Sequence, residues 1–433
     1  MVAGEVVGAR RETVALPVPV LLVVAGFAAA VVAQGGYYLP GRVMSGLLVG
    51  VAVVLARPRP NVVAALGGVF ALWAGVRGLL EGDVVSALPT MAAAGVFAGA
   101  VLVVAQADRE QRELLATVVV GVGALVALTG WVAVVFRIQS WTTVSEGLLR
   151  ASSTLTYPNA AAAVMAAAAV LSLVLKRTLL TSLMAFLLCT GIGTTMSRAA
   201  AIALMAGLLV LCVFSGFKKT VAAAAPPLFG AVVAVVALLP TMRAADEPRY
   251  LAAVAGLVAG ALVALWLHKL GRYAVLVPVF GAAALIGFAD RLSSRVTFSS
   301  PDRSGATGAA LELIARSPLL GTGPGNASLF FEQGNQGTRF MRYVHNEYLQ
   351  VLVELGAVGL VLALGVVVAV LVAMWRGRGT PLWAGAMAGV VVLLVHSGFD
   401  FLWHLPVVLI VAGICAGLGF PSTEDGIVEG TEA

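Results

Sequence analysis

Residues 290–360 read DRLSSRVTFSSPDRSGATGAALELIARSPLLGTGPGNASLFFEQGNQGTRFMRYVHNEYLQVLVELGAVGL, the one long polar interval in an otherwise almost continuously apolar chain. Six arginines and a histidine lie in it: Arg291, Arg295, Arg303, Arg316, Arg339, Arg342 and His345. Because this interval separates apolar runs, we expect water-soluble chemistry to take place here, beside a membrane.

The rest of the chain predicts a polytopic integral membrane protein. Its 433 residues are 60% hydrophobic and 11% charged, and apolar runs recur near 14–34, 43–56, 61–80, 87–105, 114–136, 158–175, 179–196, 198–214, 221–240, 250–267, 272–289, 350–374, 381–398 and 402–420. A segment in lipid must satisfy its own backbone hydrogen bonds, so each run is expected to be helical. The fold class is therefore all-α, with about 12–14 transmembrane helices and one long extracytoplasmic loop.

We expect four regions along the chain. These are an N-terminal transmembrane bundle at 1–290, an extracytoplasmic loop with short helices at 291–345, C-terminal transmembrane helices at 346–420 and a disordered acidic tail at 421–433. The first apolar run, after Arg10 and Arg11, is long enough to span and is interpreted as an uncleaved helix. Cys189, Cys212 and Cys415 lie inside apolar runs, which favours buried thiols over disulfides or a metal site.

The net charge of +6 does not require a nucleic-acid partner, since multispan proteins gather basic residues on cytoplasmic loops. With the N-terminus inside, paired basic residues fall in the inside segments: Arg10 and Arg11, Arg57 and Arg59, Arg109 and Arg112, Lys176 and Arg177, Lys218 and Lys219, Lys269 and Arg272, and Arg376 and Arg378. Single arginines fall in the short outside segments: Arg42, Arg77, Arg137, Arg150, Arg198, Arg243 and Arg249. This bias places the long loop outside the cytoplasmic membrane.

Arg198 is the only charged residue between Leu179 and Phe214. One straight helix of that length would measure ~54 Å against a hydrocarbon core of ~30 Å, so the chain must turn back. The sequence GIGTTMSRAA predicts the turn, with Ser197 as the cap of the following helix. Arg198 would then lie at an outer helix N-terminus, where an anion is favoured. The alternative is an arginine that reaches the lipid headgroups.

The long loop has order of its own. Residues 305–316 have helical spacing, with Arg303 just before them and Arg316 in the last turn, where a cation is also favoured for purely structural reasons. Pro318 and the GTGPGN run stop this helix. Asn346 is expected to cap the next helix, which brings His345 to the outer face of the membrane.

A lone histidine in a loop is usually a hydrogen-bonded structural residue. The position of His345, among several arginines at a water–membrane boundary, favours the alternative. Neighbouring positive charge stabilises the neutral imidazole, which is the form that a general base needs.

Several motifs together resemble the O-antigen ligase and Wzy-type polymerase family. They are SRAA at residues 197–200, SPLLGTGPGN at 317–326, HNEYLQVLVELGAVGL at 345–360, YPNAAAAVMAAAAVL at 157–171 and HSGFDFLWHLP at 396–406. The resemblance covers about 157–406. It implies a GT-C-like membrane glycosyltransferase that moves a glycan from an undecaprenyl-diphosphate carrier to an acceptor hydroxyl, without a nucleotide sugar, at the outer face of the cytoplasmic membrane.

The resemblance also implies site residues. Its arginine in the S-R motif corresponds to Arg198, its loop arginine to Arg303 and its histidine to His345, which are the predicted catalytic residues. Guanidinium groups suit a diphosphate leaving group because they donate paired hydrogen bonds. The predicted substrate-binding residues are Arg339, Arg342, Asn346, Glu347, Arg316, Asp400 and His404. The loop contains no DxD or HExxH motif, so we predict no metal and no cofactor.

His396, Asp400 and His404 are spaced by four and would share a face of an unbroken helix, as a metal site requires. Gly398 and Pro406 argue against that helix, which leaves a structural polar network or a direct contact with acceptor or carrier. Glu354, inside the helix after His345, is a functional candidate or the partner of an arginine.

Two other classes remain open. A transporter or flippase would also be polytopic, but it should show an internal repeat, and none is evident. A non-catalytic membrane protein of an envelope complex would not need clustered arginine and histidine. Within the enzyme hypothesis, these motifs do not separate a ligase from a polymerase.

Overall fold

The computed structural model describes residues 15–270, 301–332 and 337–421. Its α-helices are α1 (Val18–Val32), α2 (Leu39–Ala56), α3 (Val62–Leu80), α4 (Val84–Val104), α5 (Arg109–Val135), α6 (Pro158–Ser172), α7 (Leu179–Thr194), α8 (Arg198–Ser215), α9 (Phe217–Met242), α10 (Tyr250–Leu270), α12 (Pro301–Arg316), α13 (Glu347–Arg376), α14 (Pro381–Ser397) and α15 (Pro406–Leu418). Two antiparallel hairpins join β1 (Thr142–Ser145) to β2 (Leu148–Ala151) and β3 (Leu329–Glu332) to β4 (Thr338–Met341). The span predicted at 272–289 and nearly all of the tail lie outside the described residues.

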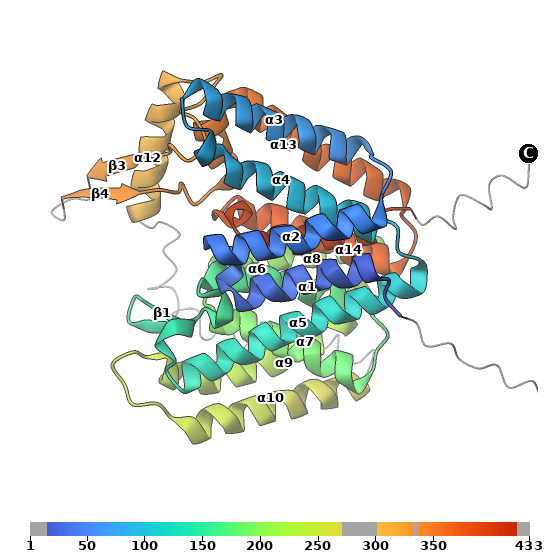
Figure 1. Ribbon diagram of the computed structural model, residues 1–433. Coiled ribbons are helices and arrows are strands. Elements are labelled where there is room, and N and C mark those ends of the chain that lie inside the picture. Colours follow the sequence, from blue (N-terminus) through green and yellow to red (C-terminus); the bar gives the residue numbers. More distant parts are fainter. Residues whose placement is uncertain (1–14, 271–300, 333–336, 422–433) are drawn as a thin grey trace, which may run out of the picture.

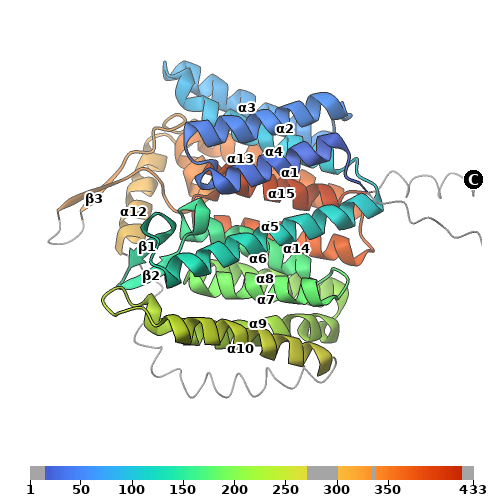
Figure 2. The same cartoon turned by 60° about the horizontal axis from the view of Figure 1, so that its bottom comes forward.

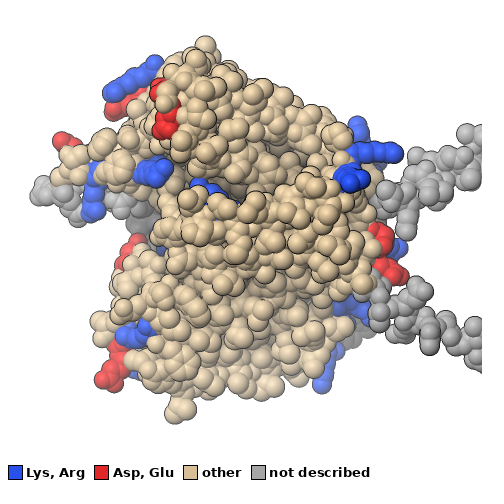
Figure 3. Space-filling model, in the orientation of Figure 1, with Lys and Arg blue, Asp and Glu red and all other residues tan. Residues whose placement is uncertain are grey.

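The described helices confirm an all-α polytopic membrane protein. Eight of them are long and apolar enough to cross a membrane, and α1, α6, α7, α14 and α15 are shorter apolar helices. Charged side chains gather toward the two ends of the molecule, and the band between them is almost free of them on the face that Figure 3 shows. That band is the surface that lipid would cover.

Helix α6 is the centre of the bundle. Every residue from Pro158 to Ser172 is buried, and α5, α7, α8, α14 and α15 pack around it. Its sequence explains this position, because a run of alanines presents no bulky side chain and lets neighbouring backbones approach closely. Helices α9 and α10 pack together on one flank, and α3 and α13 lie on the opposite flank (Figure 1).

The polar elements collect at one end of the bundle. Helix α12 and both hairpins lie there, at the left of both views (Figures 1 and 2). The turn between α7 and α8 is as predicted, since α7 ends at Thr194, α8 begins at Arg198, and the Ser197 hydroxyl accepts a hydrogen bond from the Ala200 N–H.

The loop before α13 is anchored in a break of that helix. Gly356 interrupts α13 with φ 67° and ψ −172°, and the Ala357 N–H donates to the Pro318 carbonyl at 2.9 Å. A Cβ on Gly356 would lie 2.1 Å from the Leu319 oxygen, so only glycine fits. Arg77 of α3 fastens the same loop by donating to the carbonyls of Leu320 at 2.7 Å and Gly321 at 3.1 Å.

Helix α12 begins four residues earlier than predicted, at Pro301, so Arg303 lies in its first turn rather than before it. Ala306 and Ala310 are fully buried in a small core with Leu329, Val344 and Val353, which the loop shares with the first turns of α13. Spacing of three and four residues places Arg303 on the same face as these alanines. The sequence predicted short helices in the loop, and the structure adds the β3–β4 hairpin.

Candidate functional site

Asp400, in the turn between α14 and the short 3-10 helix Leu402–His404, is the centre of the site. Its side chain is fully buried and accepts hydrogen bonds from the Tyr157 hydroxyl at 2.6 Å, from the Asn159 amide, and from the Phe401 N–H at 2.9 Å. A buried carboxylate is stable only when it is paired and hydrogen-bonded. Asp400 meets this condition through segments that are far apart in the chain.

His345 is the second member. Its Nδ1 lies 2.9 Å from Oδ1 of Asp400, and its side chain is 19% exposed. The residue has φ 57°, a left-handed conformation between β4 and α13, and the following Asn346 caps α13 through the N–H groups of Tyr348 and Leu349. The contact with a carboxylate assigns the proton to Nδ1 and leaves Nε2 as the acceptor.

Arg303 is the third member. Its guanidinium forms an ion pair with Asp400 at 3.9 Å and is 43% exposed, while the carboxylate is buried. Burial would raise the pKa of Asp400, but the hydrogen bond and charge of His345 outweigh it, with help from Tyr157, and the pKa is lowered. The site therefore holds a fixed negative charge beneath a partly exposed arginine and imidazole.

Arg150 of β2 joins this group to the turn that carries Arg198. Its Nε donates to the Thr195 carbonyl at 2.7 Å, and a terminal nitrogen donates to Oδ1 of Asn159 at 3.0 Å. Burial lowers the pKa of Arg150, and the positive charges of Arg303 and Arg198 lower it further, against the effect of Tyr157 and Asp400. Arg150 therefore interacts electrostatically with two arginines from separate parts of the chain.

The predicted catalytic residues thus come together at one end of the bundle. Arg303 and His345 contact Asp400 directly, and Arg198, exposed at the first position of α8, lies within electrostatic range of Arg150. Asp400, expected to bind substrate, lies beneath them.

A second carboxylate–histidine pair lies beside the first. Glu347 is buried at the start of α13, its carboxylate accepts the Trp403 N–H, and its Oε1 lies 3.3 Å from Nδ1 of His404. Burial lowers the pKa of His404, but the charge and hydrogen bond of Glu347 outweigh it, and the pKa is raised. His404 and Asp400 therefore belong to two different pairs, and no unbroken helix joins them to His396, since α14 ends at Ser397.

Aromatic rings separate the two pairs. Phe401 stacks on Tyr157 at 5.0 Å and on Tyr343 at 4.4 Å between ring centroids, and its edge meets His345 at 5.0 Å. Tyr343 in turn lies 4.7 Å from the ring of His404. Rings that stack on one another in this way form a rigid partition between the two pairs.

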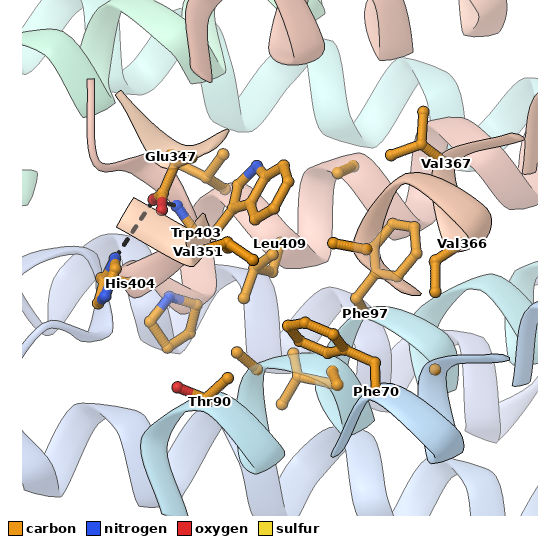
Figure 4. A pocket seen from close by; sticks show the side chains of 18 of the residues that line it. Phe70, Thr90, Phe97, Glu347, Val351, Val366, Val367, Trp403, His404 and Leu409 are labelled. Carbon is orange, nitrogen blue, oxygen red and sulfur yellow. Dashed lines mark hydrogen bonds and ion pairs between the residues drawn. The ribbon is translucent and has the colours of Figure 1, made fainter. Parts of the chain in front are cut away.

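A cavity opens on the far side of this partition. Glu347, Trp403 and His404 line one end of it, and Phe70, Phe97, Val366 and Val367 lie at the other (Figure 4). The cavity has a volume of about 170 Å³, and most of its lining is apolar. Arg42, Gln350 and Glu354 complete its polar end.

The remaining predicted residues lie outside the Asp400 cluster. Arg316, at the opposite end of α12 from Arg303, is 74% exposed and pairs with Glu312 at 3.9 Å. Arg339 is exposed on β4, and Arg342 lies 5.9 Å over the ring of Tyr343. Glu354 is buried and accepts from Gln350 at 2.7 Å, so an amide and not an arginine is its near partner.

His396 is fully buried in the last turn of α14. Within the described residues, neither of its ring nitrogens has a hydrogen-bond partner. The charges of Asp400 and Arg303 act on its ring from a distance.

Sequence reasoning missed Arg150, Tyr157 and Asn159. In the sequence, Arg150 stood out only as a single arginine in an outside segment, and Arg77 and Arg137 have the same property. Those two have structural functions, because Arg77 fastens the loop before α13 and Arg137 donates to the carbonyls of Arg243 and Ala244 at 3.0 and 3.1 Å.

Comparison with known proteins now bears on the same segment. The sequence model of the O-antigen ligase family matches residues 249–364, which contain α12, Arg303 and His345. No curated protein matches the chain. The match covers part of the chain and supports the resemblance seen in the sequence, and with the apolar helices it indicates a multi-pass membrane protein. Arg150, Arg198 and Asp400 lie outside the matched residues and are placed in the site by geometry.

Proposed function

We propose that this chain of the O-antigen ligase family transfers a glycan from a polyprenyl-diphosphate carrier to an acceptor hydroxyl, with His345 as general base and Arg198 and Arg303 as ligands of the diphosphate. The proposed carrier is undecaprenyl diphosphate, and the proposed location is the outer face of the cytoplasmic membrane. The observation that carries the proposal is the contact of His345 and Arg303 with one buried carboxylate, Asp400.

The reaction would proceed by displacement at the anomeric carbon of the transferred sugar. The bond from that carbon to the carrier diphosphate breaks, and a bond to the acceptor oxygen forms. The acceptor proton passes to Nε2 of His345, which becomes an imidazolium ion beside Asp400. Asp400 stabilises that ion and fixes the orientation of the ring, because its oxygen lies 2.9 Å from Nδ1.

The arginines supply what the leaving group needs. A diphosphate gains negative charge as its bond to the sugar breaks, and fixed guanidinium groups stabilise that charge without having to reorganise. Arg303 pairs with the single carboxylate of Asp400, and Arg150 interacts electrostatically with Asp400, Arg303 and Arg198, so this part of the site has an excess of positive charge. An anion with at least two charges would neutralise it.

The test compares carrier-linked and transferred glycan in cells and in reconstituted membranes. In His345→Gln and Arg303→Gln variants that insert normally, carrier-linked oligosaccharide should accumulate and transferred product should fall by about 10²–10⁴-fold, the usual contribution of a general base or of one charged donor. Arg316→Gln is a control for the loss of a loop arginine, because Arg316 lies at the exposed end of α12.

The same assay separates the other two function classes. A flippase would leave carrier-linked glycan on the inner face in the variants, where an added outer-face hydrolase cannot reach it. A non-catalytic complex member would keep transfer in the double variant Arg198→Ala, His345→Ala. Chain-length analysis of the product would then distinguish single transfer from polymerisation.

A further inference from the structure

A second, small cavity lies at the opposite end of α7 from the turn that carries Arg198. Its lining comes from the end of α6, the first turns of α7 and α9 and the end of α10, and the polar part includes Arg177, Thr181, Ser182 and His268. The cavity has a volume of about 20 Å³, which is room for one water-sized polar group. A ligand here would place one small polar group inside and lie mainly outside the cavity.

Prolines in α9 explain why a guanidinium is held at this cavity. Pro226 has no N–H, so the carbonyl of Ala222, four residues earlier, lacks its usual helical donor. Arg177 supplies the replacement, because a terminal nitrogen of its guanidinium donates to that carbonyl at 2.7 Å. This bond uses one of the five N–H groups of the side chain. Arg177 is therefore fixed at the exposed edge of the cavity with donor capacity to spare for a ligand.

The cavity lies at the depth of the lipid headgroups. Trp266, two residues before His268 on α10, is 62% exposed, and an exposed tryptophan is typical of the boundary between lipid and water. Ser182, in the first turn of α7, has its hydroxyl 3.4 Å from Nδ1 of His268. One turn deeper on α10, Leu262 is exposed and offers an apolar surface that an acyl chain would cover. The cavity can therefore be reached from the leaflet at this end, the cytoplasmic one in the predicted orientation.

The segments that line the cavity carry only positive charge. Residues 172–185, 217–227 and 260–270 contain five basic residues and no acidic one, and all five are exposed: Lys176, Arg177, Lys218, Lys219 and Lys269. The start of α5, at the same end of the bundle, instead mixes the two signs, and Arg109 pairs there with Glu113 at 3.5 Å. Basic side chains at the level of the headgroups attract anionic lipids.

We propose that this cavity binds the phosphate of an anionic phospholipid from the cytoplasmic leaflet, with Arg177 and His268 as its ligands and the lysines around them. The phosphate oxygens match the paired donors of a guanidinium. One oxygen would enter the cavity beside His268, and the acyl chains would lie along the exposed apolar face of α10. A soluble phosphate compound offers the same oxygens but no chains, so the experiment separates these two sources. This site takes no part in the proposed transfer reaction.

The first test is native mass spectrometry of the full-length protein, titrated with palmitoyl-oleoyl phosphatidylglycerol. Arg177→Gln should weaken binding of the first lipid about fivefold, equivalent to about 1 kcal/mol for one basic residue near an anionic headgroup. Arg378→Gln is the matched control, because Arg378 is exposed at the same end of the bundle and lies 5.1 Å over the ring of the exposed Trp375. The control should leave the affinity unchanged.

Arg177 also supports α9, so a second variant separates lipid binding from folding. Lys218 and Lys219 are exposed in the first turn of α9, and the double variant Lys218→Gln, Lys219→Gln should weaken binding about fivefold or more while the unfolding temperature stays the same. Unchanged affinity in this variant and in Arg177→Gln would overturn the proposal. An equal loss in Arg378→Gln would show a general attraction of lipid to basic surface and would also overturn it.

The second test locates the lipid and identifies its source. A phosphatidylglycerol with a diazirine close to its headgroup, added to the protein in nanodiscs, should label α7, α9 and α10 around Ser182, and phosphatidylcholine with the same chains should compete poorly. Label spread over all helices, or equal competition by phosphatidylcholine, would overturn the proposal. Protection by glycerol 3-phosphate at the same concentration would assign the site to a soluble phosphate compound and would overturn the lipid. His345→Gln should abolish transfer and leave this labelling unchanged, so the two proposals can fail separately.

Discussion

Replacing Asp400 by asparagine should slow glycan transfer about a thousandfold without preventing membrane insertion. In the proposed reaction His345 gains a proton in the transition state, and the positive ring lies 2.9 Å from the carboxylate. Two unit charges about 4 Å apart attract by about 4 kcal/mol at an effective dielectric constant of about 20. Since about 1.4 kcal/mol changes a rate tenfold, loss of this attraction slows the reaction about 10³-fold.

The substitution keeps the size of the side chain but not its hydrogen bonding. The carboxylate accepts from both Tyr157 and Asn159, whereas an asparagine has one acceptor oxygen and an NH₂ group that must face a donor. Thermal unfolding and gel filtration of the purified variant must therefore accompany the rate. Asp246→Asn is a suitable control because Asp246 is an exposed carboxylate, 3.6 Å from Arg243.

The measurement is the transfer rate at saturating donor and acceptor, followed by chromatography of carrier-linked and transferred glycan. The expected change is in kcat, with KM for the donor altered much less, because the attraction arises only when His345 becomes charged. A folded Asp400→Asn protein that transfers within about threefold of the normal rate would refute the function of this pair in catalysis.

Three further predictions concern the surroundings of the site. Arg150→Ala should reduce the transfer rate by about 10–100-fold, because it removes one or two buried hydrogen bonds worth roughly 1–3 kcal/mol in all. Arg150→Lys should restore little of this rate, because the contacts with Thr195 and Asn159 need two nitrogens of one guanidinium. The pKa of His404 is raised, so its protonation stabilises the fold fully below the unfolded value of about 6.5, and this contribution is lost as pH rises through the folded-state pKa. Thermal stability should therefore fall as pH rises above about 6.5, and Glu347→Gln should remove that dependence. Gly356→Ala should lower the free energy of unfolding by about 1–3 kcal/mol, because Gly356 has φ 67° and a Cβ there would meet the Leu319 oxygen. Gly68→Ala in α3 is the control: nothing lies within 4 Å of the added Cβ, so this variant should be neutral or slightly more stable in the same unfolding assay.

Local rules predicted much of the fold. The turn at Ser197 followed from helix length against membrane thickness, and the cap at Asn346 followed from its place before an apolar run. Both depend on a few neighbouring residues. The interruption of α13 at Gly356 was not predicted, because it results from the docking of a loop whose residues lie 35 to 39 positions earlier in the chain.

The site was predictable in part for the same reason. His345, Arg303 and Arg198 could be selected by residue type and by motif, but their meeting point could not, since Asp400 lies 55 positions from His345 and 241 from Asn159. Long-range pairing of this kind leaves no periodic signal. Arg150 is the clearest case: its neighbours in sequence form an ordinary hairpin, and its importance comes from contacts with Thr195, 45 positions away.

The two carboxylate–histidine pairs join the same two elements at two points. Asp400 and His404 are four residues apart, yet Asp400 pairs with His345 among arginines while His404 pairs with Glu347 at the end of an apolar cavity. His345 and Glu347 are themselves two residues apart, so the start of α13 and the turn after α14 contact each other twice, with Phe401 between the contacts. A shift of either element would change both pairs together. Glu347→Gln, which weakens the pair with His404, should therefore also slow transfer through His345, whereas two independent pairs would leave the transfer rate unchanged.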